Sequence, residues 1–183
     1  MEKKIGLAVA CLWCFAAGEA GAALSGDVPL RSAQDPATQW RLEDIFPDGD
    51  AWEKERDAVE ALLPRLAGFS GRLGTSGTEL LEALRQEDEI GERLGRVYAW
   101  AHMKSHEDTT DPGAQGRADR ATLLSVKAAS AGAFLAPEIL ALSPDVLEGF
   151  FRDVPALAPY RFALDRLQRV RDHVLPADQE LLL

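Results

Sequence analysis

The chain has 183 residues, of which 46% are hydrophobic and 27% charged, a composition that predicts a folded domain with a substantial core. Its 30 acidic and 20 basic residues give a formal net charge of −10. Because a phosphate-binding surface needs clustered Lys and Arg, this balance argues against nucleic acid as a partner. Beyond the N-terminal segment, we expect no stretch that spans a bilayer in the mature protein.

The first residues have the three-part layout of a secretory signal peptide. The charged start "MEKK" is followed by an apolar run over residues 5–17, and Ala20 and Ala22 then form an A-x-A pattern. We therefore predict a signal peptide over residues 1–22 and an exported protein, periplasmic or extracellular. A short buried helix is the alternative interpretation of the same run.

Cys11 and Cys14 lie inside that apolar run and spell C-x-x-C. The sequence has 2 cysteines in all, so no second pair completes a four-ligand zinc site, and no strand precedes the motif as in a thioredoxin-like site. A lipoprotein signal ending at Cys11 is a weaker variant, because the apolar run before it is short. Removal of the leader would leave a mature protein without cysteine.

Residues 23–38 are small and polar and predict a linker or a mature N-terminal tail, which leaves residues 39–183 as the folded domain. The stretch "WRLEDIFPDGDAW" opens this domain, and its apolar residues are expected to dock on the core. Asp50 is the expected N-cap of the first helix. Pro64 should kink that helix or end it early, and the glycines of "GFSGRLGTSG" should close it.

The second helix is predicted after a cap at Thr75 or Ser76. Apolar residues recur in it at three- and four-residue steps, which indicates one buried stripe; they are Leu80, Leu81, Leu84, Ile90, Leu94, Val97, Tyr98 and Ala101. The opposite face is expected to meet solvent, and it carries Glu82, Gln86, Glu89, Glu92, Arg93 and Arg96.

The remaining predicted helices are marked by prolines. Asp111 and Pro112 fit the cap and first position of a helix over residues 112–135, whose small residues allow close helix packing. Later starts are expected at Pro137, at Ser143 with Pro144, near Pro159, and at Pro176 with Asp178. Strand-like alternation with hairpin signals is absent from the sequence. The predicted fold class is therefore all-α, an antiparallel helical hairpin or bundle.

Four segments resemble one enzyme family in the same order. They are "WRLEDIFPDGDAWEKERDAVEALLPRLAGFSGRL", "YAWAHMKSHEDTTDP", "FLAPEILAL" and "LAPYRFALDRLQRVRDHVLPADQELLL". Together they resemble the N-terminal region of oligoendopeptidase F-type enzymes, which are thimet-like zinc oligopeptidases. The resemblance covers about residues 40–183.

The resemblance implies a helical N-terminal domain that packs against a separate C-terminal metallopeptidase domain and helps to wall a channel for short peptides. In the family, the zinc-binding His-Glu-x-x-His helix and a third glutamate ligand lie far downstream of this region. We therefore expect neither catalytic nor metal-binding residues in this chain, and zinc only in the full-length enzyme. The ending "QELLL" suggests a chain cut off at a helix start.

The segment "HMKSHEDTTDP" contains half of a zinc-peptidase motif. His106 and Glu107 supply its first two letters, but Thr110 stands where the second histidine belongs. His102 and His106, with Asp108 or Asp111 as a third ligand, remain a minor metal hypothesis. Turn formation and helix capping explain the acidic residues directly.

Other candidate chemistry in the sequence has a simpler interpretation. Glu87, Asp88 and Glu89 are expected to form a solvated charge run, and Tyr98, Trp100 and Phe134 to belong to the core; His173 is expected at the surface or the core edge. Neither a Gly-x-Ser-x-Gly elbow nor a phosphate-binding loop is present.

Two functions remain. The first is the N-terminal, channel-forming portion of an exported zinc-dependent oligopeptidase, inactive alone. The second is a stand-alone helical binding or interaction protein that keeps the domain without protease activity. The first predicts an exposed apolar patch where the other domain packs.

Overall fold

A computed structural model describes residues 33–173. The predicted leader, the cysteine pair, most of the predicted linker and the helix expected at Pro176 lie outside these residues. The chain divides into two units, Met1–Trp40 and Arg41–Leu183. In the described part of the first unit, a short 3-10 helix, η2 (Pro36–Thr38), is capped by the side chain of Asp35.

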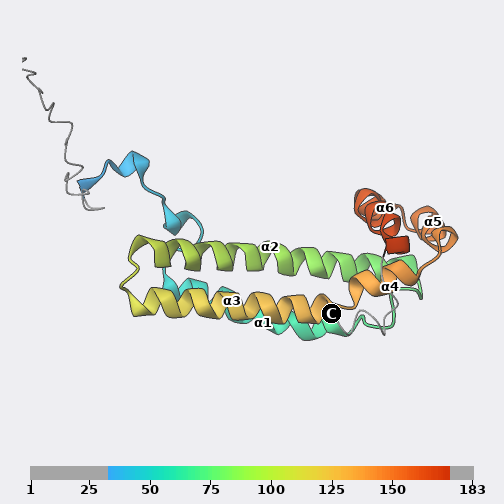
Figure 1. The fold of residues 1–183 in the computed structure, drawn as a ribbon, viewed down its shortest axis with the longest axis horizontal. Coiled ribbons are helices and arrows are strands. Elements are labelled where there is room, and N and C mark those ends of the chain that lie inside the picture. Colours follow the sequence, from blue (N-terminus) through green and yellow to red (C-terminus); the bar gives the residue numbers. More distant parts are fainter. Residues whose placement is uncertain (1–32, 174–183) are drawn as a thin grey trace, which may run out of the picture. The chain divides into compact units, whose positions relative to one another are not determined.

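The second unit is helical, and no strand occurs among residues 33–173, so the all-α prediction is confirmed. In Figure 1 three long helices lie side by side, and three short helices gather near one end of α2. The α-helices are α1 (Gly49–Ala67), α2 (Gly77–Glu107), α3 (Pro112–Gly132), α4 (Leu135–Ala141), α5 (Pro144–Asp153) and α6 (Arg161–Arg169). The 3-10 helices of this unit are η3 (Leu42–Asp44), η4 (Pro155–Tyr160) and η5 (Arg171–His173).

Side-chain caps fix the starts of most of the α-helices. Ser76 accepts from the Glu79 N–H at 3.2 Å, and Asp111 accepts from the Gly113 N–H at 2.7 Å. Ser143 caps α5 in the same way. These three caps agree with the sequence prediction, and in α3 and α5 the cap is followed by a proline at the start of the helix.

The cap expected for α1 was wrong, and so was one of the two alternatives expected for Pro64. The cap of α1 is Asp48, which accepts from the Ala51 N–H at 2.8 Å, and Asp50 lies in the first turn. Pro64 does not end the helix early, since α1 continues to Ala67. A proline near a helix C-terminus removes one hydrogen-bond donor, and the packing of the α1 core face against α2 and α3 outweighs that loss.

The core fills the space between the three long helices. Trp52, Val59 and Leu66 of α1 are fully or almost fully buried there. α3 contributes mainly small residues, among them Ala118 and Ala121, so its backbone approaches the other two helices closely. Each large apolar side chain buried in this way stabilises the fold by about 1.5–3 kcal/mol before entropy costs.

Two residues of α2 lie on the opposite side from the one predicted. Gln86 is buried, 3% exposed, because it follows Ala83 and precedes Ile90 by one turn each and so falls on the core stripe. Tyr98 is 40% exposed, and its ring stacks on that of His102 at 4.0 Å between centroids. The neighbouring Val97 takes the core position instead.

Two of the short helical segments after α3 pack on α2, and the others pack on one another. α5 and η4 both contact α2, and α4 and α6 contact each other. A Cβ atom at Gly77 would lie 3.0 Å from the Phe150 Cβ, so a glycine at the start of α2 permits the close approach of α5.

One helical stretch contradicts the expectation that no internal segment could span a bilayer. Within the described residues, Pro112–Ala141 is long and apolar enough by length and composition alone, and only 22% of its most apolar window is buried. This stretch comprises α3 and α4, which also pack on the rest of the bundle through Ala121, Leu124 and Ile139.

Candidate functional site

The two histidines of the half-motif lie near the C-terminal end of α2. His102 is half-buried, its Nε2 lies 3.2 Å from the Thr122 hydroxyl of α3, and its ring stacks on Tyr98. His106 is exposed one turn later. His102 therefore has two contacts within the bundle that explain its position without a ligand.

The acidic residues that follow serve the turn between α2 and α3. The Asp108 carboxylate accepts from the Thr110 N–H at 2.8 Å and from its hydroxyl at 2.6 Å, and these two bonds lower the pKa of Asp108. Asp111 caps α3, and Glu107 pairs with Lys104 at 2.9 Å. The capping interpretation of Asp108 and Asp111 is confirmed.

This segment does not fit a zinc ion. A structural or catalytic zinc needs at least three protein ligands, and residues 33–173 bring no three His, Cys, Asp or Glu side chains together in a suitable group. His102 directs one ring nitrogen to a hydroxyl, and Asp108 and Asp111 are engaged with backbone donors. These side chains therefore do not form a zinc-binding set.

The acidic run in the first half of α2 has a structural partner that the sequence did not predict. The Tyr160 hydroxyl donates to Asp88 at 2.6 Å, and this bond joins the end of η4 to α2. Desolvation, followed by this bond, raises the pKa of Tyr160 to about 12. Desolvation of the neighbouring Glu87 carboxyl, followed by the charge of Asp88 beside it, raises the pKa of Glu87.

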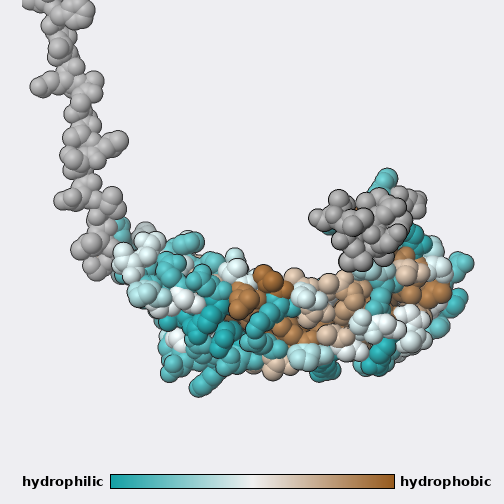
Figure 2. Space-filling view, turned by 60° about the horizontal axis from the view of Figure 1, so that its bottom comes forward, coloured by the Kyte–Doolittle hydropathy of each residue, from teal (hydrophilic) through white to brown (hydrophobic). Residues whose placement is uncertain are grey.

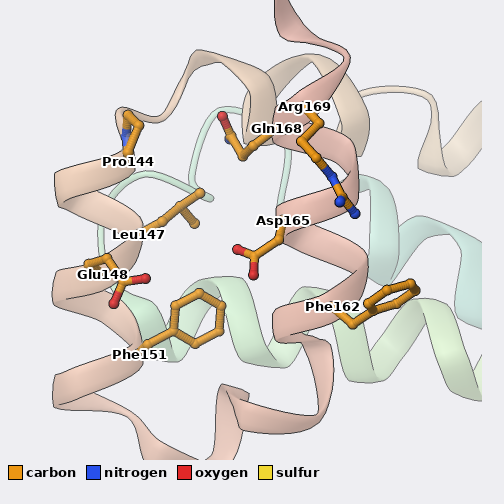
Figure 3. A pocket seen from close by; sticks show the side chains of 8 residues that line it. All are labelled: Pro144, Leu147, Glu148, Phe151, Phe162, Asp165, Gln168 and Arg169. Carbon is orange, nitrogen blue, oxygen red and sulfur yellow. The ribbon is translucent and has the colours of Figure 1, made fainter.

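A cavity of about 330 Å³ opens between α5 and α6 (Figure 3). Leu147 and Phe151 of α5 form its apolar floor, and Phe162 of α6 stands at its edge, 73% exposed. The carboxylates of Glu148 and Asp165 line it from opposite helices. Its lining contains no Ser, Thr, Cys, Lys or His side chain, so these two carboxylates are its only candidate reactive groups.

The Glu148 carboxylate at this cavity is committed to an ion pair. Arg161 donates to both Glu148 oxygens, at 2.5 and 3.3 Å, and its guanidinium lies 4.0 Å above the Phe151 ring centroid. The hydrogen bond from Arg161 lowers the pKa of Glu148. Sequence reasoning missed this cavity, because only the packing of α5 against α6 brings residues 144–151 and 162–169 together.

The similarity to known proteins is concentrated in one family. A sequence profile described as Oligopeptidase F matches residues 138–183. Oligopeptidase PepF of Bacillus subtilis is 43% identical over 159 residues, which cover 87% of this chain. The chain has the sequence and fold of the N-terminal region of an oligopeptidase F-type peptidase. The resemblance drawn from the four sequence segments is thereby confirmed.

Further relatives show the same similarity. Group B oligopeptidase PepB of Streptococcus agalactiae is 33% identical over 84% of this chain. The crystal structure of oligoendopeptidase F from Enterococcus faecium matches with a TM-score of 0.65 and 28% identity over 74% of this chain. A Chlamydophila abortus structure, at 23% identity and a TM-score of 0.72, supports the fold alone.

In each of these matches the chain covers about a quarter of the relative's length. The chain spans 24% of the B. subtilis protein, 26% of the S. agalactiae protein and 27% of the E. faecium structure. About three quarters of each oligopeptidase F-type relative therefore has no counterpart in this sequence.

Proposed function

We propose that this chain is the N-terminal, channel-forming helical portion of an exported zinc-dependent oligopeptidase that hydrolyses short peptides. The observation that carries the proposal is the 43% identity to oligopeptidase PepF over 87% of the chain but only 24% of that relative. The bond-cleaving groups and the zinc would belong to the remaining portion, and this chain would wall the substrate channel.

The charge distribution of the described helices is compatible with this supporting role. Their charged groups form cross-helix ion pairs, such as Arg93 with Glu55 at 2.6 Å and Arg161 with Glu148. Paired groups of this kind hold helices together, whereas a hydrolytic centre needs a poised base and a polarising group.

A chimera tests the peptidase role. Residues 39–183 would replace the matching region of B. subtilis PepF, and cleavage of a quenched short peptide would be measured with and without a zinc chelator. We expect chelator-sensitive hydrolysis by the chimera and none by the 183-residue chain. Hydrolysis by the chain alone, or a well-folded chimera without activity beside an active parent PepF, would overturn the proposal.

Export is tested separately. Residues 1–40 would be fused to an alkaline phosphatase that is active only after export, and the mature N-terminus would be determined by mass spectrometry. The proposal expects phosphatase activity and cleavage after Ala22, which follows from the A-x-A pattern. An inactive fusion retained in the cytoplasm would remove the export part and leave the peptidase part standing.

A further inference from the structure

The outer side of α3 and α4 carries an unusually uncharged surface. Residues 121–137 contain one charged residue, Lys127, although charged residues make up 27% of the chain. Six exposed side chains recur there mostly every three residues and are named here the α3–α4 strip: Leu123, Val126, Ala129, Ser130, Ala133 and Ala136. Leu123 is 54% and Val126 60% exposed, so the largest apolar groups of the strip meet solvent.

An ordinary surface helix buries its apolar residues and exposes its charges. α3 departs from that rule because its core face is built mainly of alanines and Leu124, while two larger apolar residues point away from the core. Figure 2, turned to bring forward the side on which α1 and α3 lie, shows apolar surface along the middle of this side. A contiguous apolar surface of this kind on a folded protein indicates an interaction site.

A groove runs beside the strip. It measures about 700 Å³, and it is bounded by Leu63, Pro64 and Ala67 of α1 and by Val126 and Ser130 of α3. Pro64 has no N–H, so the carbonyl of Glu60 on the same groove lacks the donor that α-helix geometry would supply four residues later. The only charged side chain of residues 121–137, Lys127, is paired with Glu60. The groove therefore offers an apolar wall beside a neutralised ion pair.

We propose that the α3–α4 strip and the groove beside it are the surface on which the remaining polypeptide of the oligopeptidase docks, through an apolar helix. This inference rests on the proposed function. The length of the relatives supplies the occupant, because about three quarters of their chains lie outside the region that corresponds to this one and are available to pack on it. Small residues at Ala129, Ser130 and Ala133 allow a helix to approach closely.

The same observations favour a protein over a membrane as the occupant. α3 and α4 also supply Ala121, Leu124, Leu135 and Ile139 to the core, so they cannot leave the bundle without exposing it. A surface that binds anionic lipid carries clustered Lys and Arg on its polar flank. Here the charge beside the strip is an ion pair, and the chain as a whole is acidic.

The test uses the PepF chimera with Leu123→Glu and Val126→Glu together. Because both side chains are exposed in the isolated chain, its circular dichroism and melting should not change. In the chimera, two buried carboxylates should reduce peptidase activity at least about tenfold, the effect of roughly 1.4 kcal/mol of lost docking energy. Val146→Glu, an exposed valine on α5, is the matched control and should leave the activity unchanged.

Cysteine footprinting gives a second readout that needs no activity. Val126→Cys should react with a maleimide in the leaderless isolated chain and be protected in the chimera, whereas Glu92→Cys on the exposed face of α2 should react in both. An active, monodisperse double-Glu chimera, or equal labelling of Val126→Cys in both proteins, would overturn the docking surface and leave the peptidase role intact. If the chimera without these substitutions is inactive while PepF is active, the peptidase role is contradicted. The labelling comparison still shows whether Val126 is covered in the chimera.

Two further outcomes would assign the strip to another occupant. Protection of Val126→Cys in the isolated chain, with a dimer mass by light scattering, would identify a second copy of the chain. Co-sedimentation of the isolated chain with phosphatidylglycerol vesicles, abolished by Leu123→Glu and Val126→Glu, would identify a membrane. Either result would overturn the proposal.

Discussion

Trp52 of α1 and Trp100 of α2 stack on each other in the core, with ring centroids 6.2 Å apart and planes inclined by 22°. Each indole also donates to a backbone carbonyl: Trp52 to Val97 at 2.8 Å, and Trp100 to Phe46 at 3.1 Å. The pair therefore joins α1 to α2 and fixes the segment that enters α1.

Replacing Trp52 with Phe should destabilise the chain by about 1–3 kcal/mol, because the buried bond to Val97 is lost while most of the apolar contact remains. Urea unfolding followed by circular dichroism measures the change. A double-mutant cycle with Trp100→Phe should give a coupling of about 0.5–1.5 kcal/mol, the range for aromatic pairs. Strictly additive effects would mean that the stacking is incidental.

Glu138 of α4 holds the loop between α1 and α2. Its carboxylate accepts from the Gly71 N–H at 2.5 Å and, at 3.4 Å, from Ser70 and Leu73. Glu138→Ala should therefore speed amide exchange at Gly71 and Leu73 and cost about 1–2 kcal/mol of stability. Glu138→Gln keeps an acceptor oxygen and should recover part of the loss. Unchanged amide exchange at Gly71 and Leu73 in Glu138→Ala would show that the loop is ordered without the Glu138 carboxylate.

Gly71 itself tests the backbone of that loop. It has a φ of +79°, and a Cβ atom added there would meet no other atom within 4 Å, so substitution is limited by conformation and not by space. Gly71→Ala should destabilise the chain by about 1 kcal/mol, and Gly71→Asn by less, because Asn tolerates the left-handed region. Equal midpoints of thermal unfolding for all three proteins would contradict this.

The elements that could be predicted from the sequence are those coded locally. Ser76, Asp111 and Ser143 are typical N-cap residues and so predict helix starts. The absence of strand-like alternation between apolar and polar residues predicts the all-α class. The directions of Tyr98 and Gln86 could not be predicted, because α2 is long and its core stripe is shared between α1, α3 and α5.

The candidate surfaces depended on tertiary structure even more. The Asp88–Tyr160 bond joins residues far apart in the sequence, and the exposure of Leu123 and Val126 depends on which side of α3 faces α1 and α2. The first of the two functions considered from the sequence predicted an exposed apolar patch where another domain would pack. Its position became visible only once the three helices were packed.

The Tyr160–Asp88 bond predicts a loss of stability at alkaline pH. The pKa of Tyr160 is about 12 in the folded chain and about 10 in an unfolded one, so the folded state holds the phenolic proton more tightly. This contribution is fully present below pH 10 and is lost as the pH rises through about 12. Tyr160→Phe should flatten the stability profile between these values, measured by urea unfolding. An unchanged slope would mean that the phenol ionises as freely in the folded chain.

The Glu55–Arg93 pair predicts a loss of stability as the pH falls, the opposite pH dependence to that of the Tyr160–Asp88 bond. The hydrogen bond from Arg93, together with its charge, lowers the pKa of Glu55 below its usual 4.5. The stabilisation is therefore present above that value and is lost as the pH falls through the lower pKa of the folded state. Arg93→Lys loses the two-pronged geometry and should cost about 0.5–1 kcal/mol at neutral pH, with a smaller further loss in acid. Glu92→Gln, an exposed position on the same helix, is the control.

The histidines near the end of α2 give the last prediction. His102 is held by Thr122 and Tyr98, and His106 is exposed, so neither is arranged with a third ligand among the described residues. After dialysis against zinc, the chain without residues 1–22 and its His102→Ala, His106→Ala variant should retain the same substoichiometric amount of metal by atomic emission. One zinc per chain that disappears in the variant would establish a site in this half-motif. Because the stacking of His102 on Tyr98 is also lost, a small drop in melting temperature without any change in metal content is the expected result, and it separates a packing role from a ligand role.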